Sequence, residues 1–302
     1  MQVRIGCFNK GKKTFKRIDF RWKGRKIMAF IACSPKPPQE PDFVAELVCG
    51  MPQDIFNSLM VYAPQYKFAV SGVFCHQKPL ADFGMGKNPE LGDMLLVYIE
   101  ENKYAVKKCN ALLMQAKKID RIPYIVHLSE NHQLKLYEEW LDFKLVRAGV
   151  FNGTKISVQP KTINAGAQYL LFQSPYKDEK KVCCAYPDKE LVPEKKLSDQ
   201  IIDLMKFFTG RTFTIGAHNE DDWSKMILQL ISISGVSTFN RRVSGRVNAD
   251  RLMTFGDVSL FDTINEEIEV NDNQVLDNAV PCLLIYAREE QEKYRQQEMA
   301  FD

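Results

Sequence analysis

Two apolar stretches decide the expected fold: PELGDMLLVY at residues 89–98 and NALLMQAKK at residues 110–118. Each is typical of a buried β-strand, with Asp93 at the entrance of the first strand and Gln115 and Lys117 inside the second. Because residues two apart in a strand point to the same side of the sheet, Gln115 and Lys117 share one face. We therefore expect the three polar side chains to converge where neighbouring strands end.

Polar side chains at this spacing suit the hydrolysis of a phosphodiester bond. The reaction needs an attacking water and a cation that offsets the charge growing on the phosphate. Magnesium keeps several waters and binds through one or two protein carboxylates, so a sparse set of oxygen ligands is the expected signature. Asp93 and Gln115 supply such oxygens, and Lys117 can orient the water and contact the phosphate. The pattern predicts a Mg²⁺ or Mn²⁺ site with these three catalytic residues.

The rest of the first half of the chain predicts helices and strands in the order α-β-β-β-α-β. The segment after Pro41 is expected to form a short helix ending near Gly50, and Pro52 is expected to open a second helix. The expected fold class is α/β. The later elements are strands at 68–76, 92–100 and 110–119, an extension of the sheet at 122–128, a helix at 129–141 and a strand at 142–148.

These residues resemble the PD-(D/E)XK nuclease superfamily, whose pattern is an acid, a gap and then acid-x-Lys on the next strand. Asp93, Gln115 and Lys117 occupy the three motif positions. The resemblance covers residues 40–150 and implies a restriction-endonuclease-like core with magnesium-dependent endonuclease activity. The departure is Gln115, since Glu or Asp is commoner there; its amide can offer a carbonyl oxygen but no charge. Mrr-like members of the superfamily also carry Gln-x-Lys.

Two further details of the resemblance concern helices. Glu46 lies on the helix before the sheet, where many members carry an additional metal-binding glutamate, so the resemblance implies Glu46 as a third metal ligand. Glu90 and Asp82 are alternatives for that role. Gln133 and Tyr137 form a Q-x-x-x-Y pair as in RecB-like nucleases, and their spacing puts both on one helix face, where they would support the site.

The length of the chain favours two domains. With 302 residues it exceeds the usual size of a single hydrophobic core. We expect a nuclease domain at residues 1–150 and an α+β domain for recognition or oligomerisation at residues 151–302. The second half contains expected strands at 167–173 and 282–287 and expected helices at 197–208 and 221–233.

Positive charge is concentrated in two segments. The net charge of the whole chain is only +3, so contacts to DNA are expected from local patches. For the N-terminal segment the alternative is a solvated edge hairpin. The residues predicted to bind nucleic acid are Lys12, Lys13, Lys16, Arg17, Arg241, Arg242 and Arg246.

Other features of the sequence bear on where the chain acts. Its longest apolar runs are too short to span a bilayer, and its N-terminus lacks the apolar core of a signal peptide. Eight cysteines, none in a C-x-x-C pair, are typical of reduced thiols. We expect a cytoplasmic protein without a membrane partner.

Together these features predict a magnesium-dependent deoxyribonuclease, in the style of bacterial restriction and mobile-element defence proteins. DNA is the expected partner, with a homodimer or a defence-system subunit as further partners. One rival hypothesis is a nuclease-like fold that binds DNA or protein without catalysis, which a magnesium titration tests. Another is an unrelated α/β adaptor of a mobile element, which a large separation of Asp93 from Lys117 in the fold would favour.

Overall fold

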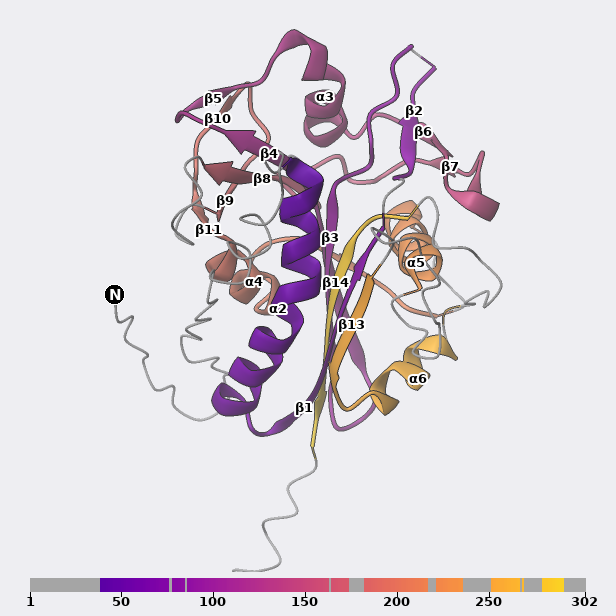
Figure 1. The fold of residues 1–302 in the computed structure, drawn as a ribbon. Helices are drawn as coiled ribbons and strands as arrows, with labels where there is room; N and C mark the ends of the chain where they lie inside the picture. The colour runs from indigo at the N-terminus through magenta and orange to yellow at the C-terminus, as the bar shows by residue number, and fades with distance from the viewer. Residues whose placement is uncertain are drawn as a thin grey trace, which may run out of the picture.

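The computed structural model describes residues 39–75, 78–84, 86–162, 164–173, 182–216, 221–235, 251–266, 268 and 279–290. They form three layers, with helices on both faces of a central β-sheet (Figure 1), which confirms the expected α/β class. The helices are α2 (Glu40–Tyr62), α3 (Asn131–Glu139), α4 (Leu197–Met205), α5 (Asp222–Ser234) and α6 (Ser259–Asn265). The strands of the central sheet are β1 (Tyr66–Phe74), β3 (Met94–Glu101), β4 (Lys107–Ile119), β8 (Ala167–Gln173), β9 (Val182–Ala185), β11 (Lys195–Lys196), β12 (Arg211–Phe213), β13 (Arg251–Gly256) and β14 (Cys282–Glu289).

The central sheet runs in the order β11-β9-β8-β4-β3-β14-β1-β13, and β12 pairs with the first half of β4. Strand β4 is antiparallel to β3 and parallel to β8, while β14 lies between β1 and β3. Because helices cover both faces, the inner strands are apolar on both sides, and every residue of β3 is buried. Strands from before and after residue 150 share this sheet, so the expected boundary at residue 150 does not separate two domains.

The two faces of the sheet carry different helices. Helices α2 and α4 pack on one face, and α3, α5 and α6 pack on the other (Figure 1). Along β4, Met114 contributes to the core under α2, whereas Leu113 contributes to the core under α3. Gln115 and Lys117 alternate with the α2-facing residues and therefore point to the α3 side.

Helix α2 is continuous, although two helices were expected around Pro52. Pro52 cannot donate a hydrogen bond to the Val48 carbonyl, which normally weakens a helix at this point. That carbonyl instead lies over Gly72 of β1, where an added Cβ would come within 1.7 Å of the Val48 oxygen. Gly72 thus permits α2 to approach the sheet, and the packing of one long apolar face keeps the helix intact.

Two segments expected in the main sheet lie outside it. Strand β5 (Tyr124–Ile125) pairs with β10 (Glu190–Leu191) in a separate two-stranded sheet. Strand β6 (Phe143–Val146) pairs with β2 (Leu80–Asp82) and β7 (Lys155–Ile156). The strand that follows α3 in the main sheet is therefore β8, which lies beside β4. No helix among the described residues is long and apolar enough to cross a membrane.

Candidate active site

Asp93 and Gln115 meet where β3 begins and β4 nears its end. The antiparallel register pairs Met94 with Met114, and it brings the preceding Asp93 next to Gln115. The Gln115 Nε2 donates a hydrogen bond to Asp93 Oδ2, and the Ala116 N–H donates to the same oxygen at 2.7 Å. The Asp93 backbone N–H also bonds to the Met114 carbonyl at 2.8 Å. Backbone and side-chain contacts therefore fix this carboxylate, which is only 3% exposed.

The second polar atom of the Gln115 amide has no hydrogen-bond partner among the described residues. Its Oε1 is buried, and the residue is only 7% exposed. A buried carbonyl oxygen left without a donor costs roughly 1–3 kcal/mol, and such atoms are uncommon in native proteins. The amide therefore presents a free oxygen lone pair next to the Asp93 carboxylate.

Lys117 follows Gln115 on the same face of β4 and forms an ion pair with Glu130. Its Nζ lies 2.5 Å from Glu130 Oε1, and Tyr124 Oη donates a hydrogen bond to the other carboxylate oxygen at 2.9 Å. Glu130 belongs to the 3₁₀ turn η1 (Leu128–Glu130) that precedes α3. Burial alone would raise the pKa of Glu130, but Lys117 and Tyr124 lower it below its usual value. The ammonium group of Lys117 is thus held in one direction.

Helix α2 brings a carboxylate to the same region through Glu40. Its Oε1 accepts a hydrogen bond from the Lys118 N–H at 2.9 Å. Burial raises the pKa of Glu40 above its usual value, and the charges of Asp93 and Glu130 act in the same direction, while Lys117 opposes them. The charges of Asp93, Glu130 and Lys117 therefore all affect the pKa of the Glu40 carboxyl group.

The role of Glu46 as a third metal ligand stays a prediction. Glu46 lies six residues after Glu40, which corresponds to about 240° of rotation around the helix. Its Oε2 lies over Gly50 on the same helix, 4.0 Å from the position of an added Cβ. The bond from the Lys118 N–H places Glu40, in the N-terminal turn of α2, against the end of β4. The acidic first turn of the helix was the available signal.

A second lysine, Lys78, also reaches Asp93 and was missed from the sequence. Its Nζ bonds to Asp93 Oδ1 and lies 3.1 Å from Glu90 Oε2. The residue is only 9% exposed; burial acts to lower its pKa, yet Asp93 and Glu90 raise it above the usual value. Of the two alternatives for the third ligand, Glu90 binds Lys78, and Asp82 accepts a hydrogen bond from the Gly84 N–H at 2.8 Å within a turn.

Tyr137 and Gln133 line the buried face of α3. The Tyr137 hydroxyl donates a hydrogen bond to the Leu91 carbonyl at 2.9 Å. An added Cβ on Gly92 would lie 3.2 Å from the same hydroxyl, so the loop before Asp93 passes close to α3. Both side chains are buried, and Tyr137 fixes the loop that carries Asp93.

The charged groups of the cluster do not balance. The carboxylates of Glu40, Glu90, Asp93 and Glu130 are four in number, whereas Lys78 and Lys117 supply two ammonium groups. With all groups ionised, the cluster carries two more negative than positive charges. Among the described residues, however, no group of three or more His, Cys, Asp and Glu side chains is arranged to hold a metal ion.

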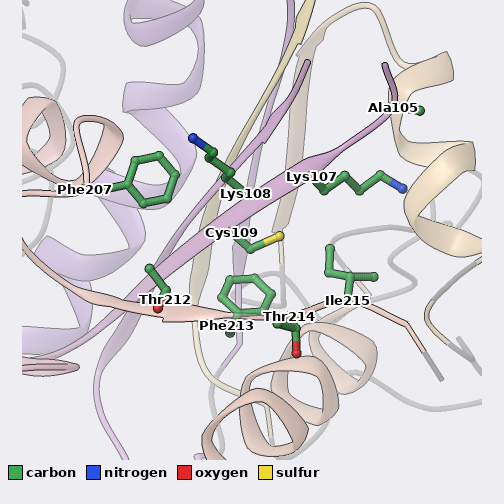
Figure 2. Close-up of a pocket in the computed structure, with 9 residues that line it drawn as sticks. All are labelled: Ala105, Lys107, Lys108, Cys109, Phe207, Thr212, Phe213, Thr214 and Ile215. Carbon is green, nitrogen blue, oxygen red and sulfur yellow. The ribbon is translucent and has the colours of Figure 1, made fainter. Parts of the chain in front are cut away.

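A separate pocket lies at the other end of β4 (Figure 2). Lys107 and Lys108 point to opposite sides of the strand there, and Phe207 and Phe213 form apolar walls. Seven residues along a strand separate Lys108 from Gln115, or about 23 Å. No carboxylate of the described residues lines this pocket, which in this respect differs from the Asp93 cluster.

All of the predicted nucleic-acid contacts lie outside the described residues. They are Lys12, Lys13, Lys16, Arg17, Arg241, Arg242 and Arg246.

Comparison of the chain with protein-family models, with curated proteins and with solved structures gave no match. The chemistry of the Asp93 cluster therefore carries the functional proposal.

Proposed function

We propose that the chain is a divalent-metal-dependent nuclease of the PD-(D/E)XK type, which hydrolyses phosphodiester bonds in DNA. The observation that carries this proposal is the buried Gln115 Oε1, which has no partner among the described residues and lies beside the Asp93 carboxylate. Lys117 follows on the same strand face, about 6.6 Å further along. An acid, a carbonyl oxygen and a lysine in this arrangement suit phosphoryl chemistry better than a purely structural role.

The residues present fit a Mg²⁺ or Mn²⁺ ion. Asp93 and the free Gln115 oxygen offer hard oxygen ligands, which both cations prefer, and waters would complete the coordination. The surplus of carboxylates around them supplies the charge that neutral Gln115 lacks. When bound, such an ion polarises the phosphate and lowers the pKa of a coordinated water.

The other side chains of the cluster have roles that follow from their contacts. Lys117 orients the attacking water and stabilises negative charge on the phosphate. Glu130, which Tyr124 orients, keeps the lysine ammonium directed along the strand face. Tyr137 holds the loop before Asp93 through the Leu91 carbonyl. A rigid shell of this kind is what a metal-assisted hydrolase requires.

The order of elements also supports the proposal. Helix α2 is followed by β1, β3 and β4, then by α3 and β8, so the main sheet and its helices follow the order α-β-β-β-α-β. The departure is β14, which lies between β1 and β3. Since β14 is beside neither Gln115 nor Lys117, it leaves the β3 and β4 ends adjacent.

One observation favours a second candidate function, a nuclease-like binding module without catalysis. Both oxygens of Asp93 already accept hydrogen bonds, from Lys78 on one side and from Gln115 and Ala116 on the other. An Asp93 carboxylate paired in this way needs no metal for its own stability. The two functions differ in their response to magnesium.

A cleavage assay on duplex and single-stranded DNA, run across a magnesium or manganese titration, tests the proposal. We expect metal-dependent cleavage that Lys117→Ala reduces by about a hundredfold to a thousandfold while the fold is kept, because the lysine acts in the chemical step. Lys195→Ala is the matched control. Lys195 lies on β11 and forms a half-buried ion pair with Asp203 at 2.7 Å, so this variant also removes a lysine from an ion pair. Absence of cleavage and of magnesium-dependent stabilisation in the wild-type protein would favour the binding module.

A further inference from the structure

Lys78 occupies the side of Asp93 that faces away from β4. The Oδ2 oxygen is held by Gln115 and the Ala116 N–H, both from β4, whereas Oδ1 accepts only from the Lys78 ammonium among the described contacts. Oδ1 is therefore the oxygen that a cation can reach without breaking a contact to the strand. The ammonium group stands where that cation would bind.

We infer that Lys78 is an internal competitor for the divalent cation, which holds Asp93 until the ion displaces it and thereby sets the metal concentration that the site requires. The inference rests on the proposed function. An ammonium group and a divalent cation cannot share one carboxylate oxygen in a buried site, because their repulsion is weakly screened there. Binding of the ion and pairing of Lys78 with Asp93 are therefore mutually exclusive.

Glu90 provides the place to which the ammonium moves. Its Oε2 already lies 3.1 Å from Lys78 Nζ, and its side chain is 41% exposed, whereas that of Asp93 is 5% exposed. The flexible four-carbon stem of lysine permits a short swing toward Glu90 and solvent. Lys78 keeps one ion pair during this exchange, so its release from Asp93 does not leave an unpaired buried ammonium.

The arrangement also explains how the metal-free site tolerates the buried Asp93 carboxylate. A buried charge without a partner is strongly destabilising, and Lys78 supplies the partner. The apparent affinity for the ion falls in proportion to the fraction of molecules in which Oδ1 is open. With about one molecule in ten open, removal of the competitor strengthens binding about tenfold.

The test uses Lys78→Met in the full chain, because methionine keeps much of the stem and removes the charge. Mg²⁺ binding is measured by calorimetry without DNA, and thermal unfolding is measured in EDTA and in saturating Mg²⁺. We expect the variant to bind Mg²⁺ about tenfold more tightly than the wild type. It should unfold at a lower temperature in EDTA, and Mg²⁺ should close that gap. Lys195→Met, which breaks the remote pair with Asp203, should leave Mg²⁺ binding unchanged.

We expect Glu90→Gln to weaken Mg²⁺ binding. Without the Glu90 charge, Lys78 stays paired with Asp93, and a higher Mg²⁺ concentration should be needed to fill the site. In the Lys78→Met background the same change should lose most of this effect, since Glu90 acts through Lys78. If Lys78→Met does not fold in EDTA, Lys78→Arg supplies the second measurement, because it keeps the charge and should bind Mg²⁺ no more tightly than the wild type.

The outcomes separate this inference from the proposed function. Equal Mg²⁺ affinity of wild type and Lys78→Met, or tighter binding by Lys78→Arg, would overturn the competitor role and leave the metal site standing. Absence of Mg²⁺ binding in both wild type and Lys78→Met would remove the metal site itself, and the proposed function with it.

Discussion

Replacement of Gln115 by Glu tests the site most directly, because it exchanges the buried amide nitrogen for an oxygen and adds a negative charge. The Gln115 Nε2 donates to Asp93 Oδ2, so a carboxylate at this position would lose that hydrogen bond and face a second carboxylate. Two unit charges about 4 Å apart repel by roughly 4 kcal/mol at an effective dielectric constant of 20, and proton uptake by one of them limits the cost. We expect Gln115→Glu to lower the free energy of unfolding by roughly 2–4 kcal/mol without metal.

Magnesium should reverse this loss. A ligand present at about 100 times its dissociation constant adds about 2.7 kcal/mol of stability, which is close to the expected cost of the added charge. The extra carboxylate should also tighten metal binding, since a hard cation prefers a charged oxygen to an amide oxygen. Thermal unfolding across a magnesium titration measures both effects. A loss of 2–4 kcal/mol corresponds to roughly 3–6 °C in a protein of this size.

Gln200→Glu is the matched control for this experiment. Gln200 is fully buried, its Nε2 donates to Thr209 Oγ1 at 2.8 Å, and its Oε1 also lacks a partner among the described residues. It lies on α4, and the partner of its Nε2 is a threonine hydroxyl, whereas the partner of the Gln115 Nε2 is a carboxylate. The control should lose stability in EDTA and recover none of it with magnesium. If Gln115→Glu behaves in the same way, Gln115 is a structural residue and the reasoning about its free oxygen is refuted.

Three further changes test the support of the site. Glu130→Gln removes the partner of Lys117. The pKa of Glu130 is lower in the folded protein than in the unfolded chain, so the ion pair stabilises the fold. This stabilisation is fully present above about pH 5 and is lost as the pH falls. The difference in melting temperature between wild type and variant should therefore shrink below about pH 4, and a difference independent of pH would contradict this role. Tyr137→Phe leaves the Leu91 carbonyl without the Tyr137 donor, so the free energy of unfolding, measured in urea, should fall by roughly 1–3 kcal/mol and cleavage should be slower. If stability and cleavage are both unchanged, the hydroxyl does not hold the loop. Gly72→Ala should lower the free energy of unfolding by roughly 1–3 kcal/mol or more, because the new Cβ collides with the Val48 carbonyl of α2. A variant as stable as the wild type would mean that the helix can move away from the sheet at no cost.

The face on which Gln115 and Lys117 lie could be predicted because strand alternation is a local property. The placement of Asp93 beside Gln115 followed from two consecutive strands, which pair far more often than distant ones. The partners Lys78 and Glu130 could not be predicted in the same way. Each comes from a segment without a motif, and only the packing of the β1–β2 connection and of η1 against the strand ends brings them to the site.

The sequence could not decide which glutamate of α2 lies near the ends of the strands. The sequence placed an acidic residue on a helix before the sheet, and both Glu40 and Glu46 meet that description. Which of them reaches the site depends on the rotation and axial position of α2 relative to β4. Those are set by the approach of α2 to Gly72 and by the bond from the Lys118 N–H to Glu40, which are tertiary contacts.

The sequence by itself determined the α/β class, the faces of the strands and the spacing of Asp93, Gln115 and Lys117, because these depend on the period of side chains along one element. Only the tertiary structure decided that β14 lies between β1 and β3, that one sheet joins both halves of the chain, and that two ion pairs enclose the site. Strand order and ion pairing link residues far apart along the chain, so their geometry is fixed by packing of the whole core.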